Sequence, residues 1–481
     1  MTAGSFAAID LGASSGRVIV GRVGPRTLDL DEVHRFPNAP VALPDGLHWD
    51  ILRLYREVLD GLRLAGRGND GVLGVAVDSW GVDYGLLDAT GALIGAPFHY
   101  RDPRTGPAVA AVEAIVPAAR LYERTGMQFL SINTLYQLTA DLGTPRADAA
   151  RSMVMIPDLI GHWLSGVIET EETNASTTGL LDPRTRSWDV GLLDALGLPR
   201  ALFGPLHHPG DTIGPVRAQV AEESGLAPTT VVTHVGSHDT ASAVVGVPAV
   251  DDRFAYIACG TWALVGVELA APILTEASRV AGFTNELGVD GRVRYLHNVM
   301  GLWLLQESLR TWDRAGVPEA LEDLLVAAGS LSSGGPTIDP NDPDLLAPGD
   351  MPRRIEAQLE RTGQAVPGSR AALVRCILDS LAAAFADTVR HAMTLSGRSV
   401  EVLHIVGGGS QNRLLCQLTA DACGLPVVAG PVEATAIGNL LVQARAQGAV
   451  AGDLATLRAL VRSGSTLARY EPRTARTQRD G

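Results

Sequence analysis

A pattern of two apolar segments joined by a turn of small residues occurs twice in the chain, once near its start and once after residue 250. The first copy covers 6–10, 11–16 and 17–23, and the second covers 254–258, 259–262 and 263–269. Two apolar runs around a turn that contains glycine predict a β-hairpin. A chain of 481 residues is too long for one compact core. The repeated hairpin therefore predicts two related domains.

The segments around the hairpins are typical of an α/β fold. Apolar residues at helical spacing predict a helix over 49–63, and apolar runs predict a strand over 72–78 and a strand and turn over 85–91. Further along we expect a helix (152–166), a polar loop (170–178), a strand (230–235), a helix (241–247), a strand (402–406), a helix (412–422) and a strand (426–429). Pro248 and its small neighbours mark the boundary between a domain of residues 1–247 and one of 248–465, and 466–481 reads as a loose tail.

The charged residues exclude several classes of protein. The chain has 39 basic and 53 acidic residues and a net charge of −14, which disfavours a general binder of nucleic acid or of anionic membranes. All the basic residues are arginine, because the sequence contains no lysine. A P-loop lysine, the strand lysine of protein kinases and a Schiff-base lysine are therefore excluded. A small anionic ligand held by a few groups stays compatible with these counts.

The cysteines point neither to a disulfide scaffold nor to a metal motif. Cys259, Cys376, Cys416 and Cys423 form no C-x-x-C pair. In a helix, the last two would have Cα atoms roughly 10 Å apart, beyond disulfide range. No basic leader precedes the first apolar run, and no uncharged apolar run reaches about 18 residues. We therefore expect a cytoplasmic protein without a membrane partner.

The turn of the first hairpin has the composition of a phosphate-binding loop. Asp10 ends the first strand, the turn 12–16 is rich in glycine and serine, and Arg17 follows it. Backbone N–H groups in such a turn can approach a phosphate closely, because glycine has no Cβ. Asp10 is a candidate to hold Mg²⁺ through water. An ordinary hairpin with a Gly/Ser tip is the alternative interpretation.

Two later glycine-containing turns add to this pattern. Gly260 and Thr261 form the tip of the second hairpin, and 407–409 is a run of three glycines between a strand and a helix. Each is weak alone, since close helix–strand packing also accounts for glycine at such a step. Their order, with one hairpin in each half, describes a nucleotide held in a cleft between two related domains.

Asp239 is the candidate general base. It follows a predicted strand and stands at the start of a predicted helix, where the helix dipole stabilises an ionised carboxylate. Such a carboxylate can accept the proton of a neighbouring hydroxyl. A simple N-cap role accounts for the same residue. His238 is a weaker alternative for the base.

The segment 78–83 is a candidate sugar-binding loop. It follows a buried strand and contains two aspartates, a tryptophan and a glycine. Hydrogen bonds to hydroxyl groups and stacking on C–H faces suit a polyhydroxylated ligand. Ordinary loop polarity accounts for the two aspartates about as well.

Seven segments together resemble the FGGY carbohydrate kinases, which have the actin/hexokinase-like fold. In order, they are 8–17, 77–83, 133–138, 173–178, 237–244, 298–306 and 404–412. The most specific are S-H-D-T-A-S-A-V at 237–244 and M-G-L-W-L-L-Q at 300–306. The resemblance implies an α/β fold of two related ribonuclease-H-like domains with ATP and a sugar in the cleft between them.

The same resemblance implies transfer of the γ-phosphoryl group of ATP to O1 of L-rhamnulose, with Asp239 as proton acceptor and Asp10 serving Mg²⁺. The residues implied for the nucleotide are Ala13, Ser14, Ser15, Gly16, Arg17, Thr261, Gln306 and Gly408. The residues implied for the sugar are Gly81, His238, Asp239, Thr240 and Asn298. The chain departs from the family pattern at Ala263, where a serine is expected, and at Ser410, where a cysteine is expected.

Three alternatives stay open at this point. The sugar could be another ketose or polyol, such as fuculose or xylulose. The chain could be a catalytically silent sensor of sugar or nucleotide, or an actin-fold ATPase that uses no sugar. In the kinase interpretation the partners are a ketose and MgATP, and the protein is a monomer or a weak homo-oligomer.

Overall fold

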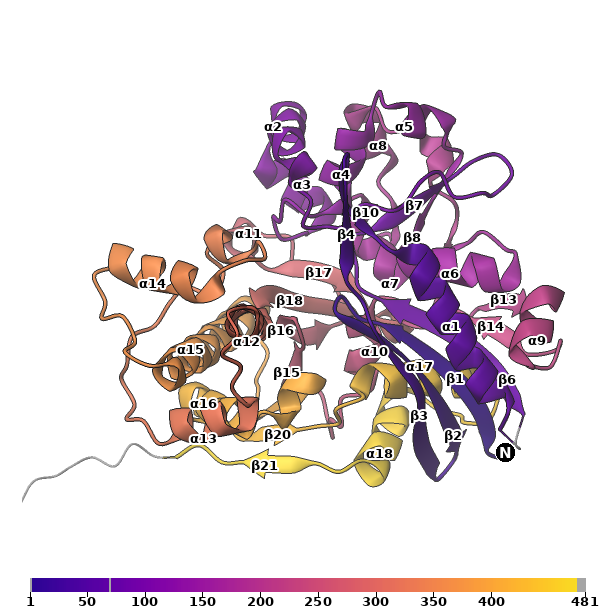
Figure 1. The fold of residues 1–481 in the computed structure, drawn as a ribbon. Coiled ribbons are helices and arrows are strands. Elements are labelled where there is room, and N and C mark those ends of the chain that lie inside the picture. Colours follow the sequence, from indigo (N-terminus) through magenta and orange to yellow (C-terminus); the bar gives the residue numbers. More distant parts are fainter. Residues whose placement is uncertain (1, 69–70, 474–481) are drawn as a thin grey trace, which may run out of the picture. The chain divides into compact units, whose positions relative to one another are not determined.

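The computed structural model describes residues 2–68 and 71–473 (Figure 1) and forms two compact units. Unit 1 consists of the chain up to Val250 together with two later segments, Glu268–Leu296 and Glu433–Ser465. Unit 2 consists of Asp251–Val267, His297–Val432 and the described residues from Thr466 onward. Both later segments of unit 1 fall in the range that the sequence assigns to the C-terminal domain.

Unit 1 is built on a six-stranded mixed sheet in the order β13-β14-β6-β1-β2-β3. Its strands are β1 (Gly4–Leu11), β2 (Ser15–Gly24), β3 (Thr27–Pro37), β6 (Val72–Ser79), β13 (Thr212–Pro215) and β14 (Val231–Thr233). β1 pairs antiparallel with β2 and parallel with β6. The parallel register sets Asp10 opposite Asp78, so the ends of β1 and β6 bring two carboxylates together.

Helices cover both faces of this sheet. α1 (Ile51–Gly66) lies against Val18 of β2, whereas the next residue, Ile19, clusters with Leu440 of α17 (Ala434–Ala446). Successive side chains of a strand point to opposite faces, so α1 and α17 lie on opposite sides. α6 (Ile156–Ser165) contacts β6, and α10 (Asp239–Val245) packs on α17.

Shorter elements complete unit 1. Among them are three antiparallel pairs of strands, β4/β5, β7/β8 and β10/β11. The short strands are β4 (Pro40–Leu43), β5 (Gly46–Trp49), β7 (Tyr84–Leu87), β8 (Ser152–Met155), β9 (Thr170–Glu171), β10 (Leu181–Asp182), β11 (Ser187–Trp188), β12 (Leu206–His207) and β17 (Thr284–Leu287). The remaining helices are α2 (Gly106–Ile115), α3 (Ala118–Thr125), α4 (Thr134–Asp141), α5 (Pro145–Ala149), α7 (Glu172–Ala175), α8 (Val190–Leu196), α9 (Ala218–Ser224), α11 (Glu276–Val280) and α18 (Leu454–Gly464).

Unit 2 has its own sheet, in which β16, β15, β19, β20 and β21 are neighbours in this order. The strands are β15 (Phe254–Cys259), β16 (Trp262–Leu269), β19 (Val402–Val406), β20 (Val427–Ala429) and β21 (Ala468–Tyr470), and β18 (Val293–Met300) enters the unit at His297. The helices are α12 (Trp303–Arg314), α13 (Leu321–Gly329), α14 (Met351–Arg361), α15 (Arg370–Ser396) and α16 (Arg413–Cys423).

Both predicted hairpins are confirmed. β1 pairs with β2 from Gly4 to Leu11, and β15 pairs with β16 across a tip at Gly260 and Thr261. Each hairpin is followed across the sheet by a parallel strand, β6 next to β1 and β19 next to β15. The two sheets therefore share one local topology, as the repeated sequence pattern predicts.

Three predicted elements are wrong in part. Residues 152–155 form β8 and pair with β7, and α6 begins only at Ile156. Pro157 sits in the first turn of α6, the helix position that tolerates proline, and it marked this start in the sequence. The predicted loop 170–178 contains β9, α7 and a 3₁₀ turn. The Glu171 side chain accepts hydrogen bonds from the backbone N–H groups of Thr173 and Asn174 and so caps α7.

The third error concerns the predicted tail. Residues 468–470 form β21 and pair antiparallel with β20. Residues 474–481 lie outside the described part of the chain. The four cysteines are free, and Cys416 is buried on α16 as the helical pattern predicts. Among the described residues, no helix has the length and apolar character to cross a bilayer.

Candidate active site

Two buried carboxylates lie next to each other where β1 and β6 end. Asp10 is 2 % exposed and Asp78 is fully buried. Asn439 of α17 donates a hydrogen bond of 2.6 Å to Oδ2 of Asp78. Oδ1 of Asp78 has no hydrogen-bond partner, and Oδ2 of Asp10 has none besides its ion pair with Arg17. Buried carboxylate oxygens without hydrogen bonds are costly, so these two atoms are candidates to hold a cation.

The charges around these carboxylates change their pKa values. Burial raises the pKa of Asp10 to about 6, the Arg17 guanidinium lowers it, and the charges of Asp239 and Glu433 raise it further. Burial also holds the pKa of Asp78 well above its ordinary value, with Asp10 and Asp239 adding to the effect. A cation bound beside Asp10 and Asp78 would offset the cost of ionising these two carboxylates.

Arg17 is held between two acidic side chains. It stands opposite Asp10 on β2, with Nε 3.0 Å from Oδ2 of that residue. Its Nη1 donates to Glu433, which precedes α17, and Arg35 contacts the other oxygen of Glu433 at 3.3 Å. The predicted phosphate-binding cation is thus already paired within unit 1. Glu433 carried no local sequence signal, because it lies 416 residues away from Arg17.

The turn 12–16 keeps its shape through hydrogen bonds to Asn38. The backbone N–H of Asn38 donates to the carbonyl of Ser14 at 3.1 Å, and its side chain donates to the carbonyl of Gly12 at 2.9 Å. Ala13, Ser14 and Ser15 are half-buried at the tip of the turn. A Cβ on Gly16 would lie 2.2 Å from the ring of Phe36, so packing against Phe36 is what requires glycine at this position.

Asp239 is the first residue of α10, and His238 occupies the N-cap position. Its side chain is 29 % exposed, which distinguishes it from the buried Asp10 and Asp78. Nε2 of His238 lies 3.5 Å from Oδ1 of Asp239, and Thr240 donates its hydroxyl to the same oxygen at 3.0 Å. The three predicted residues 238–240 therefore form one group of adjacent polar side chains.

A buried ion pair orients His238. Arg294 of β18 and Glu286 of β17 are 3.0 Å apart, and Glu286 is also 3.1 Å from Nδ1 of His238. Nη2 of Arg294 lies 3.1 Å from the same Nδ1, so this guanidinium and the Glu286 carboxylate together fix the orientation of the imidazole ring. Burial alone would raise the pKa of Glu286, but Arg294 and His238 bring it below its ordinary value, so the carboxylate stays ionised. Sequence reasoning missed this pair, which has no local motif.

The segment between β14 and α10 is fixed by another buried carboxylate, that of Glu171. Glu171 is fully buried and accepts from both the backbone N–H and the hydroxyl of Ser237, at 3.2 and 2.7 Å. Asn174 donates to the carbonyl of Ser237 at 3.2 Å. These bonds hold the backbone just before His238 and Asp239, so the candidate base stands on a rigid support.

The predicted sugar loop 78–83 has a different construction from the one its composition suggests. Asp83 is fully buried and accepts from Gln137, Tyr100 and the indoles of Trp49 and Trp80, and burial raises its pKa to about 6 despite these bonds. Trp80 is 5 % exposed. Neither Asp83 nor the Trp80 ring is therefore a free ligand group, and the expectation for them is wrong.

Gly81 and Val82 are the unusual part of this loop. Val82 has a left-handed backbone with φ +68, which is a strained conformation for a β-branched residue. Two hydrogen bonds hold it there, because the backbone N–H of Val82 donates to Thr177 Oγ1 at 2.9 Å and Thr134 Oγ1 donates to the Val82 carbonyl at 2.7 Å. A Cβ on Gly81 would lie 2.9 Å from Thr177. Strain that surrounding bonds enforce is typical of functional loops.

The predicted nucleotide residues of unit 2 gather around the second hairpin tip. The backbone N–H groups of Gly301 and Trp303 donate to the carbonyl of Thr261 at 3.1 and 3.2 Å, which sets the start of α12 against the tip. Gln306 lies in the first turn of α12, and its buried Oε1 has no hydrogen-bond partner. Asn298 lies on β18 and also belongs to unit 2.

The three glycines at 407–409 have three different roles. Gly407 has φ +80, a backbone that favours glycine. A Cβ on Gly409 would lie 2.3 Å from Sγ of Cys259, so close packing on β15 requires that glycine. A Cβ on Gly408 would have no atom within 4 Å, so Gly408 is the glycine of the three that is open to a ligand.

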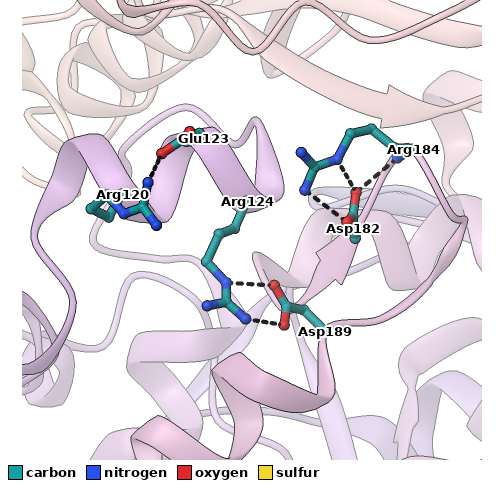
Figure 2. A pocket seen from close by; sticks show the side chains of 6 residues that line it. All are labelled: Arg120, Glu123, Arg124, Asp182, Arg184 and Asp189. Atoms are coloured by element: carbon teal, nitrogen blue, oxygen red, sulfur yellow. Dashed lines mark hydrogen bonds and ion pairs between the residues drawn. The ribbon is translucent and has the colours of Figure 1, made fainter.

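A polar hollow of about 300 Å³ lies elsewhere in unit 1 (Figure 2). It is lined by Arg120, Glu123, Arg124, Asp182, Arg184 and Asp189. Figure 2 shows each arginine paired with one of the acids, and Arg184 holds Asp182 with two bonds of 2.8 Å. The charges within the hollow balance, and no residue predicted from the sequence lies in it.

Comparisons with known proteins identify the family of this chain. The N-terminal domain model of the FGGY family of carbohydrate kinases matches residues 6–246, and the C-terminal domain model of the same family matches 255–447. The chain belongs to the FGGY family of carbohydrate kinases. It is therefore a sugar kinase, and the sensor and sugar-free ATPase alternatives are not favoured.

Individual relatives match along nearly the whole chain. The chain is 40% identical over 470 residues to a rhamnulokinase of Bacteroides thetaiotaomicron, covering 97% of this chain and 96% of the relative. It is 42% identical over 477 residues to a rhamnulokinase of Pectobacterium carotovorum, covering 98% and 94%.

Solved structures show the same fold. A ligand-bound xylulose kinase from Lactobacillus acidophilus has a TM-score of 0.80 at 15% identity, covering 98% of this chain and 94% of that one. A glycerol kinase from Plasmodium falciparum with ADP has a TM-score of 0.78 at 15% identity, with the same coverage. At such identities the likeness establishes the two-domain α/β fold predicted from the sequence.

Proposed function

We propose that this FGGY kinase transfers the γ-phosphoryl group of ATP to O1 of L-rhamnulose, giving L-rhamnulose 1-phosphate and ADP, as a step of L-rhamnose catabolism. The observation that carries the choice of sugar is the similarity, at 40–42% identity over nearly the full length, to relatives named rhamnulokinase. The consumption of ATP implies a cytoplasmic location.

In this proposal Asp239 accepts the proton of the attacking hydroxyl. The O1–H bond breaks as O1 forms its bond to the γ-phosphorus, and the bond from that phosphorus to the ADP oxygen breaks. The partial exposure of Asp239 and its place at the start of α10 suit an ionised base that reaches a ligand. His238, whose ring is held by Arg294 and Glu286, is suited to form a hydrogen bond with a sugar oxygen. Gly81, Thr240 and Asn298 are the further residues proposed for the sugar.

The nucleotide is assigned to the two hairpin tips and the glycine turn. Backbone N–H groups of 13–16 and the Arg17 guanidinium would face the phosphates, and Thr261, Gln306 and Gly408 would contact the nucleotide from unit 2. The unpaired Oε1 of Gln306 and the open space at Gly408 support this assignment. Because the chain has no lysine, arginine, backbone donors and Mg²⁺ together would supply the positive potential.

The carboxylates at the ends of β1 and β6 fit Mg²⁺. Asp10 would hold the ion, with Asp78 beside it, since both have buried oxygens without hydrogen bonds. When bound, Mg²⁺ supplies charge neutralisation for the transferring phosphoryl group. The chain's own contribution is to fix these two oxygens through the β1/β6 register and the Asn439 hydrogen bond.

A panel of ketoses and polyols tested with MgATP, with ADP release as the readout, checks the proposal. L-rhamnulose should give the highest kcat/KM, and the product should carry phosphate on O1. A higher value for xylulose or fuculose would overturn the choice of sugar and leave the kinase assignment standing. Turnover that no sugar increases would overturn the proposed reaction.

A further inference from the structure

Two histidines and a glutamate meet in unit 1 outside the groups assigned to sugar, nucleotide and Mg²⁺. Glu169 precedes β9, His207 ends β12 and His234 follows β14. One ligand atom of each lies within 4.8 Å of the others. Nothing in the proposed phosphoryl transfer uses these three side chains, so their convergence indicates a separate role.

The two imidazoles face the same carboxylate. Nε2 of His234 is 3.0 Å from one oxygen of Glu169, and Nε2 of His207 is 3.8 Å from the other. The two rings lie nearly parallel, with centroids 5.4 Å apart and planes at 18°. Three donor atoms of the types that bind Zn²⁺ therefore point to one volume.

Backbone pairing fixes this arrangement. β12 pairs parallel with β9, with His207 opposite Glu171, so His207 and Glu169 are held in register. The N–H of Gly210 donates to the carbonyl of His234 at 2.7 Å, and the N–H of His234 donates to the carbonyl of Asp211 at 2.8 Å. These bonds join all three ligand-bearing segments, so the donor atoms are positioned without a bound ion.

A second acidic residue, Asp211, stands behind His207. Oδ2 of Asp211 lies 4.0 Å from Nδ1 of His207, the ring nitrogen that faces away from Glu169, and it accepts from the backbone N–H of His208 at 2.8 Å. A carboxylate beside the distal nitrogen is the usual support for a metal-binding histidine, and at 4.0 Å Asp211 is an ion-pair neighbour of this nitrogen without a direct hydrogen bond.

We propose that Glu169, His207 and His234 bind one divalent transition-metal cation of the Zn²⁺ type. Imidazole nitrogens select such ions over Mg²⁺, which prefers oxygen ligands. His234 is buried, with 3 % of its side chain exposed, whereas His207 and Glu169 are 28 and 20 % exposed, so the ion enters from the solvent side. The bound ion ties β9 and β12 to the end of β14, a structural role separate from catalysis.

Titration of the metal-free full-length chain with Zn²⁺ tests the proposal. One Zn²⁺ should bind per chain. Asp211→Asn removes an outer-shell partner and should weaken Zn²⁺ binding by roughly 10–100-fold. His207→Gln removes a ligand and should weaken Zn²⁺ binding by more than that. His34→Gln is the matched control, because His34 pairs with Glu57 at 2.8 Å without a second histidine. It should bind Zn²⁺ like the parent chain.

Two further measurements separate this site from zinc binding at a cysteine and from misfolding of the variant. X-ray absorption of the bound zinc should show nitrogen and oxygen neighbours, and sulfur neighbours would mean that a cysteine holds the ion and would overturn the proposal. When a chelator removes all metal, His207→Gln should unfold at the same temperature as the parent. Added Zn²⁺ should raise the unfolding temperature of the parent and leave that of His207→Gln unchanged. Equal Zn²⁺ affinity in the parent and His207→Gln would also overturn it and leave a Glu–His–His hydrogen-bonded group.

Discussion

Asp239 and Asp10 are both aspartates at the ends of secondary-structure elements, yet their surroundings give them different properties. Asp239 is partly exposed at the start of α10, and Asp10 is buried beside Asp78. Exposure suits the role proposed for Asp239, which is to take a proton from a bound sugar, and burial among like charges suits the role proposed for Asp10, which is to attract a cation. Each role predicts its own response to mutation.

Replacing Asp239 with asparagine removes the proposed proton acceptor and keeps its shape. General-base contributions are roughly 10²–10⁴-fold, so kcat should fall by about that factor while the sugar dissociation constant stays nearly unchanged. Steady-state kinetics and calorimetric sugar binding measure the two effects. Asp453→Asn is the control, because Asp453 caps α18 and asparagine also caps well. A near-normal kcat in Asp239→Asn would place the base elsewhere.

Replacing Asp10 with asparagine should stabilise the metal-free protein at pH 7. The pKa of Asp10 is about 6 in the folded chain against an ordinary 3.8, so the folded state binds more protons between these values and stability falls as pH rises through this window. Asparagine carries no buried charge. The gain in stability of Asp10→Asn over the parent should therefore be present above pH 6 and vanish below about pH 4. Thermal unfolding across this range, without metal, measures the difference.

The same variant should lose its response to Mg²⁺. The parent should gain stability on addition of Mg²⁺, and Asp10→Asn should gain much less. The exposed Asp29→Asn is the control and should behave like the parent in both experiments. An Asp10→Asn protein that is less stable than the parent at pH 7 would show that the Arg17 ion pair outweighs the cost of burial.

At the scale of elements, the crossing of α10 and α17 decides where Asp239 stands. A Cβ on Gly438 of α17 would lie 1.8 Å from the carbonyl oxygen of Ser242 on α10, and one on Gly246 would lie 2.3 Å from the carbonyl oxygen of Ala434. Two glycines, one from each segment, thus allow the backbones to touch. Asn439, next to Gly438, then reaches Asp78 at the end of β6.

Gly438→Ala should force the two helices apart. Overpacking of this kind costs about 1–3 kcal/mol and can cost more against a rigid backbone atom. We expect a lower free energy of unfolding in urea together with a lower kcat, because α10 carries Asp239. Gly106→Ala is the control, since a Cβ at Gly106 meets no atom within 4 Å. Unchanged stability and kcat in Gly438→Ala would mean that the crossing adjusts freely.

At the scale of the whole molecule, unit 1 is assembled from distant parts of the chain. Leu440 and Leu441 of α17 cluster with Phe6, Ala8 and Ile19 of the N-terminal sheet, and Gln443 donates to the carbonyl of Ala7 at 3.0 Å. Each large buried side chain contributes about 1.5–3 kcal/mol relative to exposure. A cut at residue 250 would expose this sheet face.

A fragment of residues 1–250 should therefore lack a cooperative unfolding transition. Co-expression with 251–481 should restore a folded pair, because that piece supplies both missing segments of unit 1. Circular dichroism during thermal unfolding, with the intact chain as reference, measures this. Cooperative unfolding of the isolated fragment at the temperature of the intact chain would contradict the prediction.

The sequence alone determined the features that depend on neighbouring residues. The two hairpins, the strands that lie beside them and the placement of Asp10 and Asp239 at element ends follow from local apolar patterns and turn residues. The family also followed, because its motifs are continuous runs such as 237–244. The start of α6 was recoverable from Pro157, although the apolar run before it hid β8.

Only the tertiary structure decided which side chains meet and which are buried. Asp78 and Asn439 are 361 residues apart, and Arg17 and Glu433 are 416 apart, so no local period could join them. Composition made Asp83 a ligand candidate, but donors from its own loop and from three other segments occupy its buried oxygens. Local patterns arise from backbone geometry over a few residues, whereas burial and charge coupling depend on chain segments that meet only after folding.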